Sequence, residues 1–197
     1  MKRVEDHFET FPILETDRIL LRPITYADID NMYQYCAMPQ VSRYTTWNYH
    51  RSKEDTKGFI DFVLNRYETE KVGPWGIEYK ETMQLIGSCS FVRWDNRCLR
   101  AELGYVLSNE YWNQGIMTEV VNRIIEYAFK DLELVRIEAK CHPENVGSAR
   151  VMEKSGMKFE GILRKYLWSK EELQDVKLYS IIRDDFEGRF EDGLGIG

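Results

Sequence analysis

The sequence predicts one α/β (α+β) domain in which a mixed sheet carries helices on both faces. The chain has 197 residues, which suits one domain with a sizeable core. Hydrophobic residues make up 43% and charged residues 30%, as is ordinary for a globular protein. Stretches with helical spacing and stretches with strand-like alternation follow one another without a strict βαβ order, which favours a mixed sheet.

The first part of the chain predicts a strand and two helices. Residues 16–23 read as a strand that ends in a proline, which cannot donate to a ladder. Residues 27–37 have apolar residues at helical spacing. Ser52 begins a second helix, because Asp55 three positions later forms a weak capping box. The loop between these helices, 38–51, is rich in aromatic residues.

The middle of the chain changes to strand periodicity. Residues 75–79 and 85–92 read as a hairpin around a polar turn, and 101–107 as a further strand. Residues 116–129 form the clearest helix, because their apolar residues make one continuous stripe.

The last part predicts three more strands and a short helix. Residues 135–141 alternate strictly, which indicates a strand with one buried face. Residues 145–155 read as a short helix that Gly156 ends. Strands near 158–163 and 175–182 complete a sheet of about seven strands.

The boundaries divide the chain into a lead-in (1–13), one domain (14–186) and an acidic, glycine-rich tail (187–197). From Asp184 onward there is little to bury, so we expect the chain to be frayed.

Composition excludes several classes of function. The net charge is −6, which gives no basic field for nucleic acid. The four cysteines form no C-x-x-C pair and the three histidines are scattered, so we expect reduced thiols and no metal site. No signal peptide and no run of about 18 apolar residues is present, so we expect a cytoplasmic protein that does not enter membranes. The sequence is compatible with a homodimer.

One junction of strand and helix has the layout of an anion site. The strand 102–107 and a short turn lead to Gly115, directly before the helix over 116–129. The first turn of a helix has unpaired N–H groups and partial positive charge, and a glycine lets a phosphate approach the backbone. Taken alone, Gly115 could equally be a plain loop residue before a core helix.

The turn 112–117 resembles the pyrophosphate loop of the GNAT acyltransferase superfamily, whose pattern is Q/R-x-x-G-x-G/A. Trp112 replaces the first Gln/Arg, and Met117 stands where Gly or Ala is usual. Neither change removes a backbone N–H. Further stretches resemble the RimJ/RimL-like branch, ribosomal-protein N-terminal acetyltransferases and relatives, in one order and spacing. They are 16–23, 101–105, 111–119, 145–161 and 175–180.

The resemblance implies a donor site for acetyl-CoA. The fourth and fifth strands, 101–107 and 135–141, would run parallel and splay apart, and the pantetheine arm of coenzyme A would enter between them. The residues implied to bind it are Val106, Leu107, Gln114, Gly115, Met117, Thr118 and Asn145. For Asn145 the alternative is a plain helix N-cap, and both roles could coexist.

The resemblance also implies direct attack of an amine on the thioester. Glu102 is the candidate base, because an amine of pKa about 8–10 is mostly protonated at neutral pH. Ser148 is the candidate partner of the leaving thiolate, and Tyr166 a weaker one. Leu167 occupies the place of a carboxylate that RimL-type enzymes have. Glu102 and Ser148 could instead have structural roles, and Cys141 could be a nucleophile or a core residue.

The acceptor side is expected to use Tyr44 and Trp47 of the aromatic loop, which could alternatively cover the core. The predicted activity is acetylation of a primary amine, on a protein or peptide terminus. The alternatives are a small-molecule acetyltransferase acting on a polyamine, amino sugar or antibiotic, and a coenzyme-A-binding module without catalysis.

Overall fold

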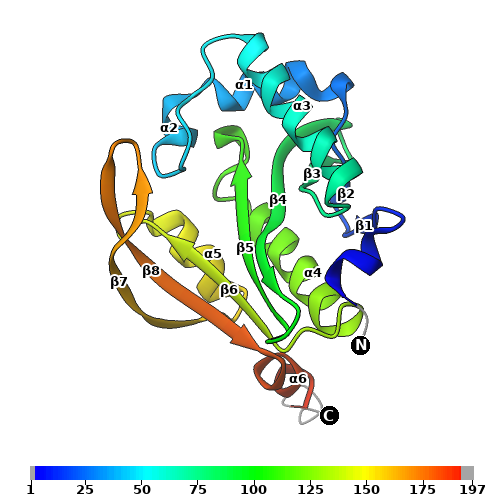
Figure 1. Cartoon of the computed structure of the whole chain (residues 1–197), viewed down its shortest axis with the longest axis vertical. Helices are drawn as coiled ribbons and strands as arrows, with labels where there is room; N and C mark the ends of the chain where they lie inside the picture. The colour runs from blue at the N-terminus through cyan, green and yellow to red at the C-terminus, as the bar shows by residue number, and fades with distance from the viewer. Residues whose placement is uncertain (1–2, 192–197) are drawn as a thin grey trace.

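One mixed sheet of eight strands organises the chain (Figure 1). The computed structural model describes residues 3–191. The strands lie in the order β1-β2-β3-β4-β5-β6-β8-β7, and only β5 and β6 are parallel neighbours. Their bounds are β1 Leu14–Glu15, β2 Ile19–Pro23, β3 Trp75–Tyr79, β4 Gln84–Asp95, β5 Arg100–Leu107, β6 Arg136–Cys141, β7 Lys158–Ser169 and β8 Glu172–Ile182.

In the described part of the chain, six α-helices and three short 3₁₀ turns accompany the sheet. The helices are α1 Ile29–Cys36, α2 Pro39–Ser42, α3 Lys53–Thr69, α4 Ile116–Lys130, α5 Val146–Lys154 and α6 Arg183–Glu191. The 3₁₀ turns are η1 Val4–Phe8, η2 Tyr26–Asp28 and η3 Asn109–Tyr111. Within residues 3–191 no helix has the length and apolar character needed to cross a bilayer. The same residues contain no cluster of His, Cys, Asp and Glu suited to a metal ion.

The two faces of the sheet have separate apolar cores. The larger core packs α4 against the sheet, and Val120, Ile124 and Ala128 of that helix are fully buried. The smaller core packs α1 and α3 with Leu85 of β4, and Val106 of β5 lies against it. Helices on both faces are therefore confirmed, and they brace the sheet from opposite sides.

The sheet splits between β5 and β6. These strands pair from Arg100↔Arg136 to Leu103↔Ala139 and no further. Beyond that point β5 continues to Leu107 beside β4, and β6 continues to Cys141 beside β8. Figure 1 shows the two strands diverging above this point. The expected splay between the fourth and fifth of the seven predicted strands is confirmed, with β1 as an additional edge strand.

Residues near both ends of the described range 3–191 are more ordered than their sequence indicates. Val4 and Phe8 of the expected lead-in are buried in the larger core. At the other end the expectation of a frayed chain from Asp184 is wrong up to residue 191, because these residues form α6. The rest of the expected tail, 192–197, lies outside the described residues.

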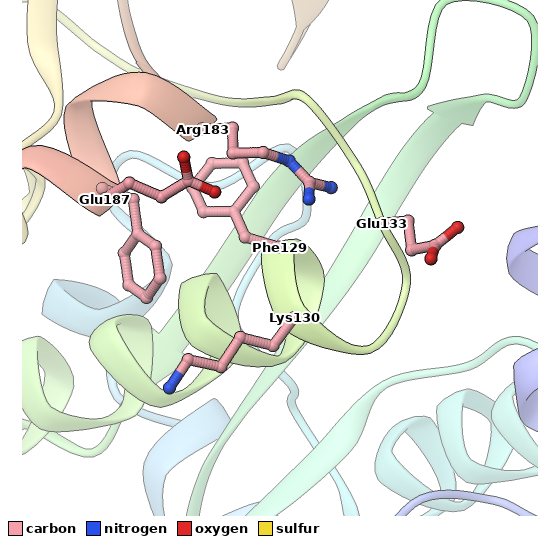
Figure 2. Close-up of a pocket in the computed structure, with 6 residues that line it drawn as sticks. Phe129, Lys130, Glu133, Arg183 and Glu187 are labelled. Carbon is pink, nitrogen blue, oxygen red and sulfur yellow. The ribbon is translucent and has the colours of Figure 1, made fainter.

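Helix α6 docks on the C-terminal end of α4. Phe186 is 7% exposed, and its ring lies 5.3 Å from that of Phe129. The Arg183 guanidinium donates to the Leu134 carbonyl at 2.7 Å. Figure 2 shows the hollow between the two helices, with Phe129, Arg183 and Glu187 around it. These contacts give the acidic segment an apolar and a polar anchor.

We expect Phe186→Ala to lower the free energy of unfolding by about 3 kcal/mol, the low end for a buried Phe→Ala change, because a terminal helix can detach locally. Urea denaturation measures this. Phe62→Ala is the control, since Phe62 is 56% exposed and its loss should cost under about 1 kcal/mol. Equal losses in the two variants would mean that α6 does not contribute to the cooperative fold.

Candidate active site

The split exposes backbone groups of β5. The Ser108 N–H donates to the Ile86 carbonyl of β4 at 2.7 Å. Because backbone groups alternate between the two edges of a strand, Val106 also faces β4, whereas Tyr105 and Leu107 face the gap. The Leu107 carbonyl accepts from the Trp112 indole N–H at 2.9 Å. The Tyr105 backbone and the Leu107 N–H are therefore the groups directed into the gap.

Helix α4 begins beside the end of β5 with its N–H groups free of side-chain caps. Gly115 is the N-cap residue, at φ +76°, where an L side chain is disfavoured. No side chain caps this end of α4. The Met117 side chain is buried in the larger core, so it does not crowd the entrance although Gly or Ala is usual there. The first turn therefore presents backbone N–H groups to an anion.

The residues before Gly115 form a fixed loop. The Gln114 side-chain amide donates to the Glu110 carbonyl at 2.9 Å, and the Trp112 indole is tied to β5. Asn113 has a positive φ of 60°. The loop is held at both its start and its end, so its shape is set before any ligand binds.

Asn145 is a helix N-cap, as one of its two predicted roles requires. Its Oδ1 accepts from the Ser148 N–H at 3.1 Å. The cap engages the amide oxygen and leaves the amide NH₂ for other partners. The cap also fixes the first turn of α5, which carries Ser148.

Ser148 belongs to a small polar cluster on the α5 side of the gap. Its hydroxyl lies 3.0 Å from the Tyr105 hydroxyl, which also donates to the Ser148 carbonyl at 3.2 Å. Burial raises the pKa of the Tyr105 phenol, so that it stays protonated at neutral pH. Tyr105 was not among the predicted site residues, although it follows Gly104 in one of the matching stretches.

Cys141 lies next to this cluster as a buried, protonated thiol. Burial raises its pKa to about 11, against smaller opposing effects of Lys177 and a hydrogen bond with Ser148. A thiol of this pKa is a poor nucleophile at neutral pH. The core reading of Cys141 therefore fits its environment better than the nucleophile reading.

Glu102 lies on the other face of the sheet and is paired with a cation. Its neighbours Ala101 and Leu103 point into the larger core, so alternation directs Glu102 away from α4. Lys140 Nζ lies 2.5 Å from Glu102 Oε2, and the same ammonium lies 4.9 Å from the centre of the Tyr166 ring. Sequence periodicity could not reveal this pair, because it depends on the register between β5 and β6.

The aromatic loop reaches both sides of the gap. The Tyr44 ring stacks on that of His142, which directly follows β6, at 5.1 Å and 19°. Trp47 packs against the smaller core, as Val106 of β5 does. The loop thus extends from the end of β6 toward β5, on the face that carries Glu102.

The tip of the β7–β8 hairpin holds this loop. Lys170 Nζ donates to the carbonyls of Ser42 at 2.5 Å and Arg43 at 3.1 Å, at the end of α2. Figure 1 shows the hairpin tip beside the chain that follows α2. Lys170 and Glu171 both have positive φ, as a two-residue hairpin turn requires, but neither is the Asn or Gly that such turns favour. Strands β7 and β8 continue up to this turn, so the hairpin is longer than the strands predicted at 158–163 and 175–182.

The structure thus groups the predicted residues into two sets on opposite faces of the split. Gly115, Asn145 and Ser148 lie toward α4 and α5. Glu102 lies on the opposite face. An acyl group held between the strands could receive an amine from one face and lose its leaving group toward the other.

The chain matches the acetyltransferase (GNAT) domain family over residues 18–158. It is 35% identical over 173 residues to the uncharacterized N-acetyltransferase YoaA of Bacillus subtilis, covering 88% of this chain and 98% of the relative. It is 33% identical over 134 residues to the ribosomal-protein-serine acetyltransferase of Escherichia coli, covering 68% of this chain and 74% of the relative.

Comparison with solved structures also identifies the GNAT family. The crystal structure of a GNAT-family acetyltransferase from Bacillus anthracis superimposes with a TM-score of 0.78 at 27% identity, covering 88% of this chain and 99% of that one. Solved structures with this fold include complexes with coenzyme A and with acetyl-CoA. The chain therefore belongs to the GNAT acetyltransferase family and is an N-acetyltransferase.

Proposed function

We propose that this enzyme acetylates the α-amine of a protein or peptide by direct attack on the thioester. The observation that carries the mechanism is the split between β5 and β6, which has a carboxylate on one face and a hydroxyl cluster on the other. The E. coli relative is named a ribosomal-protein-serine acetyltransferase, and this supports a protein or peptide terminus as the acceptor.

The donor side would hold acetyl-CoA mainly through backbone groups. The pyrophosphate would bind N–H groups of the segment 114–118, above all those of Gly115, Met117 and Thr118. The pantetheine arm would pair with the Tyr105 and Leu107 backbone in the gap, and the Asn145 amide would donate to it. Backbone donors suit this role because they are fixed by the fold and need no side-chain ordering.

The reaction itself moves one acetyl group and two protons. Glu102 would accept a proton from the ammonium, directly or through water, so that the neutral amine attacks the carbonyl carbon. The new C–N bond forms as the C–S bond breaks. Ser148 would donate its hydrogen bond to the departing thiolate, while Tyr105 holds the Ser148 hydroxyl in place. The attacking nitrogen would lose its second proton through Glu102 to water, and the thiolate would take a proton from water through the Ser148 hydroxyl, so that one proton is released overall. Base and acid on opposite faces match the opposite directions of attack and departure.

A small amine is the second candidate acceptor. The net charge of −6 would steer polycations toward the protein, and the stacked rings of Tyr44 and His142 would offer an aromatic surface to a cationic amine. A polyamine or aminoglycoside would be favoured by these features.

A panel of acceptors tests the proposed function. With acetyl-CoA and equal concentrations of N-terminal peptides, polyamines and aminoglycosides, we expect kcat/KM to be highest for a peptide, by about tenfold or more. Coenzyme A release and product mass measure this. Selective turnover of a polyamine or aminoglycoside would support the second candidate instead, and tight coenzyme A binding with no turnover of any amine would exclude catalysis.

The proton-transfer roles predict losses in kcat. Glu102→Gln and Ser148→Ala should each lower kcat by about tenfold or more, with little change in KM for acetyl-CoA. Glu102→Gln leaves the Lys140 ammonium unpaired, so the double variant Glu102→Gln/Lys140→Met separates instability from lost chemistry. A return of activity in the double variant would show that Glu102 only balances Lys140.

Direct attack predicts that Cys141 is dispensable for chemistry. Its thiol, with a pKa of about 11, is not ionised at neutral pH. We expect Cys141→Ala to keep kcat within about threefold of the unmodified enzyme, and rapid-quench mass spectrometry to find no acetylated protein in either. Burst release of coenzyme A that disappears in Cys141→Ala would instead indicate an acyl-enzyme.

A further inference from the structure

A carboxylate lies in an unfavourable place for an anion site. Glu119 is in the first turn of α4, whose free N–H groups would take the pyrophosphate. An acidic residue there favours the helix but repels a bound phosphate. Glu119 therefore needs a compensating charge if α4 is to bind coenzyme A.

That compensation comes from the turn between β1 and β2. Arg18 Nε lies 2.7 Å from Glu119 Oε2, and Arg18 Nη2 lies 2.6 Å from the same oxygen. The Arg18 backbone N–H and the Thr16 hydroxyl donate to Oε1. Burial alone would raise the pKa of Glu119, but these hydrogen bonds lower it below its ordinary value. The carboxylate is thus ionised and neutralised by one guanidinium.

The same guanidinium also contacts the pyrophosphate loop. Arg18 Nη1 donates to the Gln114 carbonyl at 3.1 Å. The C=O of Gln114 and the N–H of Gly115 belong to one planar trans peptide and point in opposite directions. Holding this carbonyl on Arg18 therefore turns the Gly115 N–H away from Arg18. A Cβ on Gly115 would lie 3.8 Å from Arg18 Nη2, so the guanidinium is adjacent to the glycine itself.

The region around Arg18 is rich in carboxylates, which increases the need for a cation at the start of α4. A hollow beside the N-terminal half of α4 is lined by several acidic side chains. Its charged members are Glu15, Asp17, Glu119, Arg123 and Glu126. Lys80 neutralises Glu15 at 3.0 Å and reaches the Thr16 carbonyl at 2.7 Å, but it does not contact α4. Within this region Arg18 is the cation placed at the start of the helix.

We propose that Arg18 is a positioning residue of the donor site, which neutralises Glu119 and orients the Gln114–Gly115 peptide so that α4 accepts the pyrophosphate of coenzyme A. The inference rests on the donor site proposed above. It assigns Arg18 a role through Glu119 and Gln114, not as a phosphate ligand.

The test is a double-mutant cycle read by calorimetric titration with coenzyme A. Arg18→Gln should weaken binding by about 20-fold or more, because it leaves the Glu119 charge uncompensated beside the pyrophosphate. Glu119→Gln alone should change the dissociation constant by less than about threefold. The double variant should recover most of the affinity and bind within about fivefold of the unmodified protein, since the Glu119 repulsion is gone and only the contact with the Gln114 carbonyl stays lost. A double variant as weak as Arg18→Gln would overturn the proposed role.

A truncated donor gives a second readout. S-acetylpantetheine lacks the pyrophosphate, so its KM should be the same in Arg18→Gln and the unmodified enzyme, with kcat unchanged for acetyl-CoA at saturation. Equal losses with both donors would mean that Arg18 only stabilises the fold. Lys80→Gln is the matched control, because Lys80, which follows β3, is a cation that contacts the same β1–β2 turn, and its loss should leave coenzyme A binding within about threefold.

The same protein samples distinguish a loss of stability from a failure of the proposed donor site and from a failure of the proposed role of Arg18. Thermal unfolding reports whether Arg18→Gln is folded. Arg18→Lys keeps the positive charge but lacks the planar guanidinium that makes two hydrogen bonds, so it should bind coenzyme A with intermediate affinity. Failure of the unmodified protein to bind coenzyme A would reject the proposed donor site. Tight binding by both the unmodified protein and Arg18→Gln would reject only the role of Arg18.

Discussion

The structure depends on how early β5 and β6 stop pairing. Four residue pairs join these parallel strands before they part after Leu103 and Ala139. The two strands can separate and remain part of the sheet because each stays paired on its other edge, β5 with β4 and β6 with β8. Backbone groups need partners, so the unpaired edge of β5 is able to pair with a ligand, as proposed for the pantetheine arm. The helix entrance, the capped start of α5 and the aromatic loop all meet at this edge.

The split also separates two chemical environments. On the α4 and α5 side the groups are hydroxyls, a protonated thiol and backbone N–H donors. On the other side Glu102 and Lys140 form an ion pair under the Tyr166 ring. The sheet thus separates the proposed base, Glu102, from the hydroxyls proposed to assist the leaving group, although both lie near the same gap. Under the proposed mechanism acyl transfer uses both sets of groups in one step, and the two-faced geometry allows this.

Much of this arrangement could be predicted from periodicity and the resemblance, and the rest depends on long-range contacts. The helix at 116–130 was predictable because its apolar stripe is continuous, and Gly115 because it precedes that stripe. Helix α6 was not, because its burial depends on Phe129, which no local pattern links to Phe186. Lys140 and Tyr105 were missed as site residues because their contacts with Glu102 and Ser148 follow from strand register and helix placement.

The hairpin that holds the aromatic loop has a consequence for how such an enzyme could change its acceptor. Lys170 reaches Ser42 and Arg43 from a turn of two residues, so the proposed acceptor face is bordered by two segments joined through their tips. The groups proposed to bind the donor, in contrast, are mostly main-chain atoms of β5 and α4. Altering the length or sequence of the hairpin would reshape the acceptor face and leave those atoms in place. Enzymes with this arrangement could therefore differ in the amine that they accept while the main-chain atoms proposed to bind the donor stay the same.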